Sequence, residues 1–238
     1  MKTIEIAHLY YDVMNLNGDA GNMMALKRHF ESQGVKLNIH FLTIDDKIDF
    51  NKFDLYYIGN GSRDSFNLVL DDIMKYKNDI KEAIENNKYF ICTGTSMELF
   101  GGHFNYLNNK KQDCLGIFDY FSEEVSDQIV GEFVFQTSLI NDLIIGFQNR
   151  YSKVINRDNH LLNMVKGTGK LPDRIEEGII YKNFMATYLL GPLLIRNPKF
   201  TDYLVKKILK EKDIPYKEIS NTYEENAYQE FMKNFVKE

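Results

Sequence analysis

The segment KYFICTGTSMELFGGHF, residues 88–104, decides the fold because it joins a strand pattern to a helix pattern through a glycine turn. Residues 89–93, YFICT, form a short continuous apolar run, which is typical of a buried strand in a parallel sheet. Gly94 begins the turn, and the start of a helix is expected after it. In α/β folds, ligands bind beyond the carboxyl ends of the strands. The segment therefore predicts an α/β fold and one place where a functional site would lie.

Strand and helix patterns alternate through the residues that precede this segment. Alternating or β-rich apolar residues predict strands at 3–11, 35–42 and 53–61. Apolar residues at helical spacing predict helices at 18–34 and 65–86. The resulting order β-α-β-β-α-β-α predicts an α/β fold with a mostly parallel central sheet and helices on both faces.

The pattern becomes β-rich in the second half of the chain. Short apolar runs separated by polar turns predict strands at 114–124, 129–137 and 142–149. The polar segment 151–177 is expected to be a loop, and the acid pair that ends it, Glu176 and Glu177, is expected to be solvated.

Two helices are expected near the C-terminus. The segment 200–213 has an amphipathic pattern with Thr201 or Asp202 near its start, and 220–238 forms a last polar helix. The chain shows no linker or repeat, so residues 1–238 are interpreted as a single domain.

Composition excludes several classes of function. A net charge of −5 gives no basic surface for nucleic acid, and no apolar run approaches the length of about 20 residues that spans a bilayer. The N-terminus lacks the features of a signal peptide, and the two cysteines, Cys92 and Cys114, are interpreted as reduced core residues of a cytoplasmic protein. His103 and His160 have no ligand partners at metal-site spacing, so neither a metal nor another cofactor is expected.

Several segments together resemble one known family. They are LNGDAGNMMALKRH (16–29), YYIGNGSRDS (56–65), LGIFDYFSEE (115–124), VGEFVF (130–135), IIGFQN (144–149) and GIIYKNFMATYLLGPLLIRNPKFTDYLV (178–205). The chain resembles the CobB/CobQ-type glutamine amidotransferase domains (class I, type 3), and most closely the GatD subunits of lipid II isoglutaminyl synthase. The resemblance implies a flavodoxin-like class I fold with an added β-rich half. It also implies hydrolysis of glutamine, with the ammonia passing to an ATP-using synthetase. For GatD this is the Mur-ligase-like subunit MurT, and the product is an amidated lipid II stem peptide.

The family's nucleophile and base do not occur at the matching positions of this chain. GTSMELFG (94–101) overlays the family's C-G-G-x-Q-x-[LM]-G, which puts Gly94 at the cysteine position. TYLLGP (187–192) overlays T-Y-x-H-G-P, which puts Leu190 at the histidine position. Cys92 lies two residues before the turn, inside the predicted strand, and is therefore interpreted as a buried hydrophobic residue. Amide hydrolysis of this type needs a thiolate and an adjacent base, so loss of catalysis is expected.

Other positions that the resemblance places around the site are partly changed. Gln128 stands where the family's basic residue would hold a carboxylate, and Asn60 interrupts the family's glycine turn. Asp19 persists and is expected to cap the first helix. The expected vestigial pocket consists of Asp19, Asn22, Gly59, Asn60, Gly61, Thr95, Ser96, Glu98, Gln128 and Asn149.

Three hypotheses follow from these residues. The first is a catalytically silent subunit that acts through a partner, such as a MurT-like ligase or an active paralogue, in the amidation of cell-wall peptidoglycan. The second is an active glutaminase that uses Thr95, Ser96 or Glu98. The third is a sensor that binds a small molecule where Gly94 and Leu190 leave a roomier, more apolar pocket. The sequence leaves open whether the oligomer is homomeric or heteromeric, and whether the pathway concerns peptidoglycan or a cobalamin-type product.

Overall fold

A computed structural model describes residues 2–155, 158–219 and 222–236. Its first sheet has six strands in the order β11-β12-β4-β3-β1-β2. All neighbouring strands in it run parallel except the edge pair β11 and β12. The bounds are β1 Thr3–Leu9, β2 Lys36–Leu42, β3 Leu55–Ile58, β4 Tyr89–Thr93, β11 Ile179–Tyr181 and β12 Phe184–Thr187. The predicted parallel sheet is confirmed, and β4 lies inside it.

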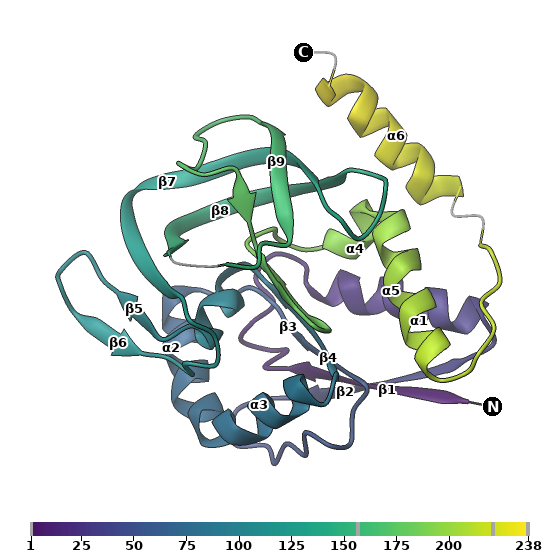
Figure 1. Cartoon of the computed structure of the whole chain (residues 1–238), viewed down its shortest axis with the longest axis horizontal. Coiled ribbons are helices and arrows are strands. Elements are labelled where there is room, and N and C mark those ends of the chain that lie inside the picture. Colours follow the sequence, from purple (N-terminus) through teal and green to yellow (C-terminus); the bar gives the residue numbers. More distant parts are fainter. Residues whose placement is uncertain (1, 156–157, 220–221, 237–238) are drawn as a thin grey trace.

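Helices cover both faces of this sheet (Figure 1). The helices α1, α4 and α5 lie on one side, and α2, η1 and α3 lie on the other. Consecutive strand residues alternate between the two cores, so Tyr56 and Phe90 pack with the α2–α3 side whereas Tyr57 and Ile91 pack with the α1–α5 side. The bounds are α1 Ala20–Ser32, α2 Arg63–Ile73, η1 Met74–Tyr76, α3 Lys77–Glu85, α4 Leu193–Arg196 and α5 Pro198–Glu211.

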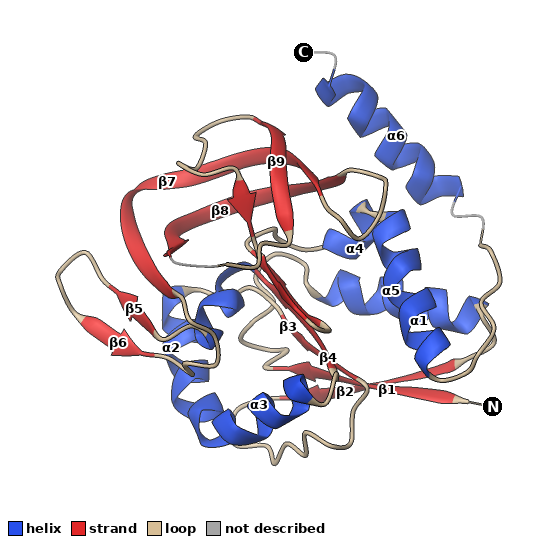
Figure 2. Ribbon diagram, viewed as in Figure 1, coloured by secondary structure: helices blue, strands red, loops and turns tan. Residues whose placement is uncertain are grey.

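A second, β-rich sheet lies beside the carboxyl ends of the first sheet's strands (Figure 2). Its strand order is β10-β9-β7-β5-β6, with β8 also paired to β7. The long antiparallel hairpin of β7 and β8 dominates it, with an irregularity in the pairing between Glu124 and Ile129. The bounds are β5 His103–Asn105, β6 Lys111–Asp113, β7 Phe121–Gln136, β8 Ile144–Ile155, β9 Leu162–Gly167 and β10 Glu176–Glu177.

The expected loop 151–177 was the main error of the sequence-based prediction. Its described residues include the end of β8, all of β9 and the short β10, while 156–157 lie outside the described residues. Its polar residues are compatible with strands because backbone pairing with β7 supplies the hydrogen bonds. Glu177 is only 4% exposed and accepts hydrogen bonds from the Thr187 hydroxyl and the Tyr188 backbone, so the expected solvation of this residue was wrong.

The predicted helices differ from the structure mainly at their ends. The region 65–86 is not one helix, because the short 3₁₀ turn η1 separates α2 from α3. The helix expected at 200–213 begins earlier, at Pro198 and after Asn197, since proline is well suited to the first position of a helix. The last helix, α6 (Thr222–Val236), agrees with the described part of 220–238; 220–221 and 237–238 lie outside the described residues.

Within the described parts of the chain, no helix has both the length and the apolar composition needed to cross a membrane.

Candidate functional site

The turn after β4 has the form of a nucleophile elbow, a sharp strand-to-helix turn that presents one residue at the edge of a sheet. We use the term elbow for residues 93–98. β4 ends at Thr93, and the 3₁₀ helix η2 (Gly94–Phe100) follows without an intervening residue. Gly94 has a φ angle of +63°, in the left-handed region that glycine adopts without strain. The backbone of an elbow is therefore present, with a glycine at its apex.

The side chain of Asn60 fills the space above this apex. A β-carbon added to Gly94 would lie 2.2 Å from Asn60 Oδ1 and 2.5 Å from Asn60 Cβ. The Asn60 carboxamide is held on both sides, since Oδ1 accepts a hydrogen bond from the Thr95 backbone at 2.9 Å and Nδ2 donates to Asn17 Oδ1 at 2.6 Å. Although residue 94 has no side chain, there is therefore no open space at the apex, and the expectation of a roomier pocket was wrong at this point.

The two hydroxyl groups of the elbow are engaged in local hydrogen bonds. Ser96 is fully buried, and its hydroxyl contacts the backbone carbonyl oxygens of Ile58 at 3.0 Å and Thr93 at 2.8 Å. The Thr95 hydroxyl contacts Asn60 Oδ1 at 3.1 Å and the Gly61 carbonyl at 3.0 Å. An activated hydroxyl nucleophile needs a base as its hydrogen-bond acceptor, whereas these hydroxyls meet carbonyl and amide oxygens.

A buried polar cluster beneath the elbow is centred on Asp19. Asp19 Oδ1 accepts hydrogen bonds from the Tyr57 and Thr93 hydroxyls, each at 2.7 Å, and Oδ2 accepts one from the Asn60 backbone at 3.2 Å. Asn22 completes the cluster by donating to Tyr57 Oη at 2.7 Å. Burial raises the pKa of Tyr57 well above its usual value, and the nearby charge of Asp19 raises it further. Asp19 makes no side-chain cap of α1, so the predicted capping role was wrong.

Glu98, at the end of the elbow, is a fully buried carboxylate. It forms an ion pair with Arg63, with 2.8 Å between Oε2 and Nη2, and it accepts hydrogen bonds from the Tyr188 and Ser152 hydroxyls. The Arg63 guanidinium lies 3.8 Å from the centre of the Phe104 ring. The bond with Ser152 of β8 joins the elbow to the second sheet.

The comparisons with known proteins identify the family. The CobB/CobQ-like glutamine amidotransferase domain matches residues 5–198 of the chain. The chain belongs to this family. It is 31% identical, over 231 residues, to the GatD subunit of lipid II isoglutaminyl synthase from Staphylococcus aureus, an alignment that covers 96% of this chain and 95% of that protein. It is 27% identical, over 212 residues, to the Streptococcus pneumoniae GatD subunit, covering 88% of this chain and 82% of the relative.

Solved structures support the same fold. A glutamine amidotransferase from Thermotoga maritima matches with a TM-score of 0.52 and 10% identity, covering 98% of this chain and 92% of the other. The glutaminase domain of Trypanosoma brucei CTPS also matches with a TM-score of 0.52 and 10% identity, covering 92% of this chain and 98% of that one. The class I glutamine amidotransferase fold predicted from the sequence is therefore confirmed.

In this member of the CobB/CobQ-like family, Leu190, which the sequence resemblance aligned with a histidine, is a buried apolar residue. Leu190 is buried, and its backbone N–H donates to the Phe147 carbonyl at 2.9 Å. The next residue, Gly191, packs tightly on the loop that holds Asn60, because an added β-carbon would lie 3.0 Å from the Asn17 carbonyl oxygen. Leu190 therefore lies next to Gly191, which packs against the loop of Asn17. The leucine side chain cannot transfer a proton.

The remaining predicted positions divide into two groups. Gly59 and Gly61 lie against the chain at Met14. A β-carbon added to Gly59 would lie 2.2 Å from the Met14 carbonyl oxygen, so this site requires glycine, whereas one added to Gly61 would lie 2.3 Å from the Met14 sulfur and would displace that side chain. Gln128 and Asn149 lie on the β7–β8 hairpin and bind each other, with 2.6 Å between Nε2 and Oδ1. The structure thus gathers Asp19, Asn22, Gly59, Asn60, Gly61 and Thr95 around the elbow, while Gln128 and Asn149 form a separate pair.

Both cysteines are buried free thiols. Cys92 lies within the core on the α2–α3 side of the sheet, and burial raises the pKa of its thiol far above the usual range. Burial also raises the pKa of Cys114 to about 12. Neither environment supplies the lowered pKa that a nucleophilic cysteine requires.

Sequence reasoning did not identify the contacts that the residues of the elbow make. Asn60 is one of the predicted pocket residues, but its contact with Gly94 joins two separate turns, and no local sequence pattern indicates such a contact. The Arg63–Glu98 pair was visible only as opposite charges at positions 35 residues apart, one after each turn. Asn17 accepts a hydrogen bond from the Asn60 carboxamide, and no sequence pattern marks it as a site residue.

Proposed function

We propose that this chain is a GatD-like subunit that no longer hydrolyses glutamine and that acts through a Mur-ligase-like partner of the MurT type. The proposed process is the amidation of peptidoglycan precursors. Both relatives named above are GatD subunits of lipid II isoglutaminyl synthase. The alignments cover most of this chain, including its β-rich half, which supports retention of a subunit role.

The observation that carries the loss of catalysis is the position of Asn60 over Gly94. Hydrolysis of an amide through a covalent intermediate needs a nucleophile, a base within hydrogen-bond reach, and donors for the oxyanion. Residue 94 offers no side chain, residue 190 offers a leucine, and the Asn60 carboxamide binds the Thr95 backbone N–H. The site therefore lacks a nucleophile and a base, and the hydrogen-bonded Asn60 side chain fills the space at its apex.

Ammonia release from glutamine tests the catalytic half of the proposal. The purified chain should release no ammonia above the rate of buffer alone, both by itself and with a co-expressed Mur-ligase-like protein. Turnover that disappears on Ser96→Ala or Cys92→Ala substitution would show an active enzyme with nonstandard residues and overturn the proposal.

Co-purification tests the partner half. A tagged chain co-expressed with a Mur-ligase-like protein from the same source should elute with it as one complex in size-exclusion chromatography. The ligase should also lose solubility or activity when the chain is omitted. If the chain elutes separately from every such ligase but together with an active amidotransferase paralogue, the proposed ligase partner is wrong and the paralogue is the partner.

The alternative of an active glutaminase receives less support from the geometry. The Thr95 and Ser96 hydroxyls are bonded to carbonyl or amide oxygens, and Glu98 is paired with Arg63. A location in the cytoplasm is proposed with the function, because the proposed ligase partner uses ATP.

A further inference from the structure

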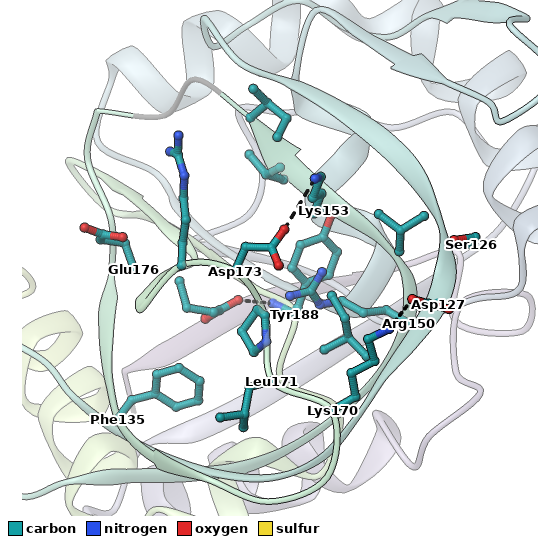
Figure 3. Close-up of a pocket in the computed structure, with 17 residues that line it drawn as sticks. Ser126, Asp127, Phe135, Arg150, Lys153, Lys170, Leu171, Asp173, Glu176 and Tyr188 are labelled. Atoms are coloured by element: carbon teal, nitrogen blue, oxygen red, sulfur yellow. Dashed lines mark hydrogen bonds and ion pairs between the residues drawn. The ribbon is translucent and has the colours of Figure 1, made fainter.

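A cavity lies inside the curl of the second sheet, away from the apex of the elbow. Its volume is about 190 Å³, and it is enclosed by the β7–β8 hairpin and the segment 170–177 (Figure 3). Neither Asn60 nor Gly94 lines it. The cavity is therefore distinct from the closed apex, and nothing in the proposed function uses it.

The inner wall of the cavity carries a fixed positive charge. The Arg150 guanidinium carbon lies 4.2 Å from the centre of the Tyr188 ring, and Arg150 is only 7% exposed. Arg150 Nε donates to Gln148 Oε1 at 3.0 Å, and Nη1 donates to the Ser152 carbonyl. A planar guanidinium stacked on an aromatic ring is preorganised for a planar anion such as a carboxylate.

Four acidic side chains line the cavity, and three of them, Asp127, Asp173 and Glu177, have named partners within this chain; Glu176 is the fourth. Glu177 uses one oxygen for the Thr187 hydroxyl and the other for the Tyr188 backbone N–H. Asp127 pairs with Lys170, and Asp173 pairs with Lys153 at 3.6 Å. Figure 3 shows these two ion pairs on either side of Arg150 and Tyr188. They connect the segment 170–173 to the β7–β8 hairpin, and their lysines offset part of the negative charge that an incoming anion would meet.

Apolar side chains form the rest of the lining. They include Ile129, Phe135, Val154, Leu171 and Pro172. An apolar cavity of about 150 Å³ holds one benzene molecule, so this volume suits a ligand of roughly six to nine non-hydrogen atoms. We propose that the cavity is a binding site for a small carboxylate with an apolar body, whose carboxylate meets Arg150 and whose body contacts the apolar walls.

Three probes of matched length test the chemistry. Hexanoate, its neutral amide hexanamide, and hexylamine are titrated separately into the isotopically labelled full chain and followed by NMR. Hexanoate should bind saturably with a dissociation constant of about 1 mM or tighter. It should shift the signals of residues around the cavity. Hexanamide should bind about ten-fold more weakly, since it cannot form charge-assisted bonds, and hexylamine should not bind. Equal binding of hexanoate and hexanamide, or no saturable binding of hexanoate, overturns the proposal.

Two variants locate the site. Leu171→Trp should fill the cavity from its outer segment and abolish hexanoate binding, whereas Leu107→Trp, at a leucine of similar exposure outside the cavity, should leave it unchanged (47% and 58% exposed, respectively). Arg150→Gln should reduce hexanoate affinity to that of hexanamide. Because Arg150 is buried, its variant could fail to fold, and Leu171→Trp then decides alone. Unchanged affinity in Leu171→Trp would place the probe elsewhere and overturn the assignment. The outcome does not depend on glutaminase activity.

Discussion

Asn60 and Gly94 are matched across the elbow, so that the side chain of one occupies the space that a side chain at the other would need. The separation of 2.2 Å between Asn60 Oδ1 and an added β-carbon at residue 94 is far below a van der Waals contact. The two residues lie in different turns, which the parallel pairing of β3 with β4 brings together. Any side chain at residue 94 therefore requires a change at residue 60.

This match predicts the behaviour of a restored cysteine. Gly94→Cys alone should lower the free energy of unfolding by about 2–5 kcal/mol, because overpacking and the left-handed backbone both oppose it. Asn60→Gly together with Gly94→Cys should be more stable than the single cysteine variant and should expose a thiol that reacts with a disulfide reagent. Urea denaturation and thiol titration measure the two effects.

The Asn60→Gly variant is the control for that experiment. It should leave thiol reactivity at the level of the parent chain, because Cys92 and Cys114 are buried. A single Gly94→Cys variant as stable as the parent would contradict the packing argument.

The ion pair between Arg63 and Glu98 predicts a strong coupling. Arg63→Met should destabilise the chain by about 3–5 kcal/mol, because it leaves a fully buried carboxylate without its counter-charge. The double variant Arg63→Met with Glu98→Gln should recover most of that loss. A double-mutant cycle from urea denaturation measures the coupling, and additive effects of the two substitutions would show that the pair is not coupled.

The buried carboxylate of Asp19 predicts a larger stability effect than a helix cap. Asp19→Asn should cost about 1–3 kcal/mol, since an amide nitrogen would replace one acceptor oxygen among buried donors. Asn15→Ala removes the side chain that accepts from the Ala20 backbone at 2.9 Å, and it should cost about 1 kcal/mol as a cap does. Equal losses of unfolding free energy in the two variants would favour a capping role for Asp19.

The fold was predictable from the sequence because its signals are local. The apolar run at 89–93 indicates a buried strand, and the helical spacing of apolar residues in 18–34 indicates a helix with one buried face. Tertiary packing did not override either preference. The prediction of a loop at 151–177 failed because the strands there are polar. Their pairing partners, β7 for β9 and β9 for β10, are not revealed by any local pattern. The expectation that Gly94 and Leu190 stand at the positions of a catalytic cysteine and histidine rests on the family resemblance alone.

The interior of the candidate site was less predictable because it depends on contacts between distant turns. The side chain of Asp19 crosses to Tyr57 and Thr93 instead of capping its own helix, a choice that requires the two neighbouring strands. The same holds for Glu177, whose burial depends on the ends of β12. Polar residues at strand ends can be solvated or buried, and the partners that decide between these states are not adjacent in sequence.

A buried histidine predicts how stability depends on pH. His8 is surrounded by the rings of Tyr11, Phe41 and Tyr57, and burial lowers its pKa from 6.5 to about 4. The folded state therefore disfavours protonation, and the unfolded state binds more protons between these two values. The stability associated with neutral His8 is present above pH 6.5 and is lost as the pH falls toward 4.

Replacement of His8 by a residue that does not titrate should make the unfolding free energy depend less on pH below neutrality. Between pH 7.5 and pH 5, protonation of His8 on unfolding should lower the unfolding free energy of the parent chain by about 2 kcal/mol. The loss measured for His8→Phe should be smaller than that of the parent chain by about 2 kcal/mol. Urea denaturation at the two pH values measures both losses. His160→Gln, at an exposed histidine, is the matched control and should follow the parent chain. If His8→Phe loses as much stability as the parent, the acid sensitivity comes from other titratable groups and not from His8.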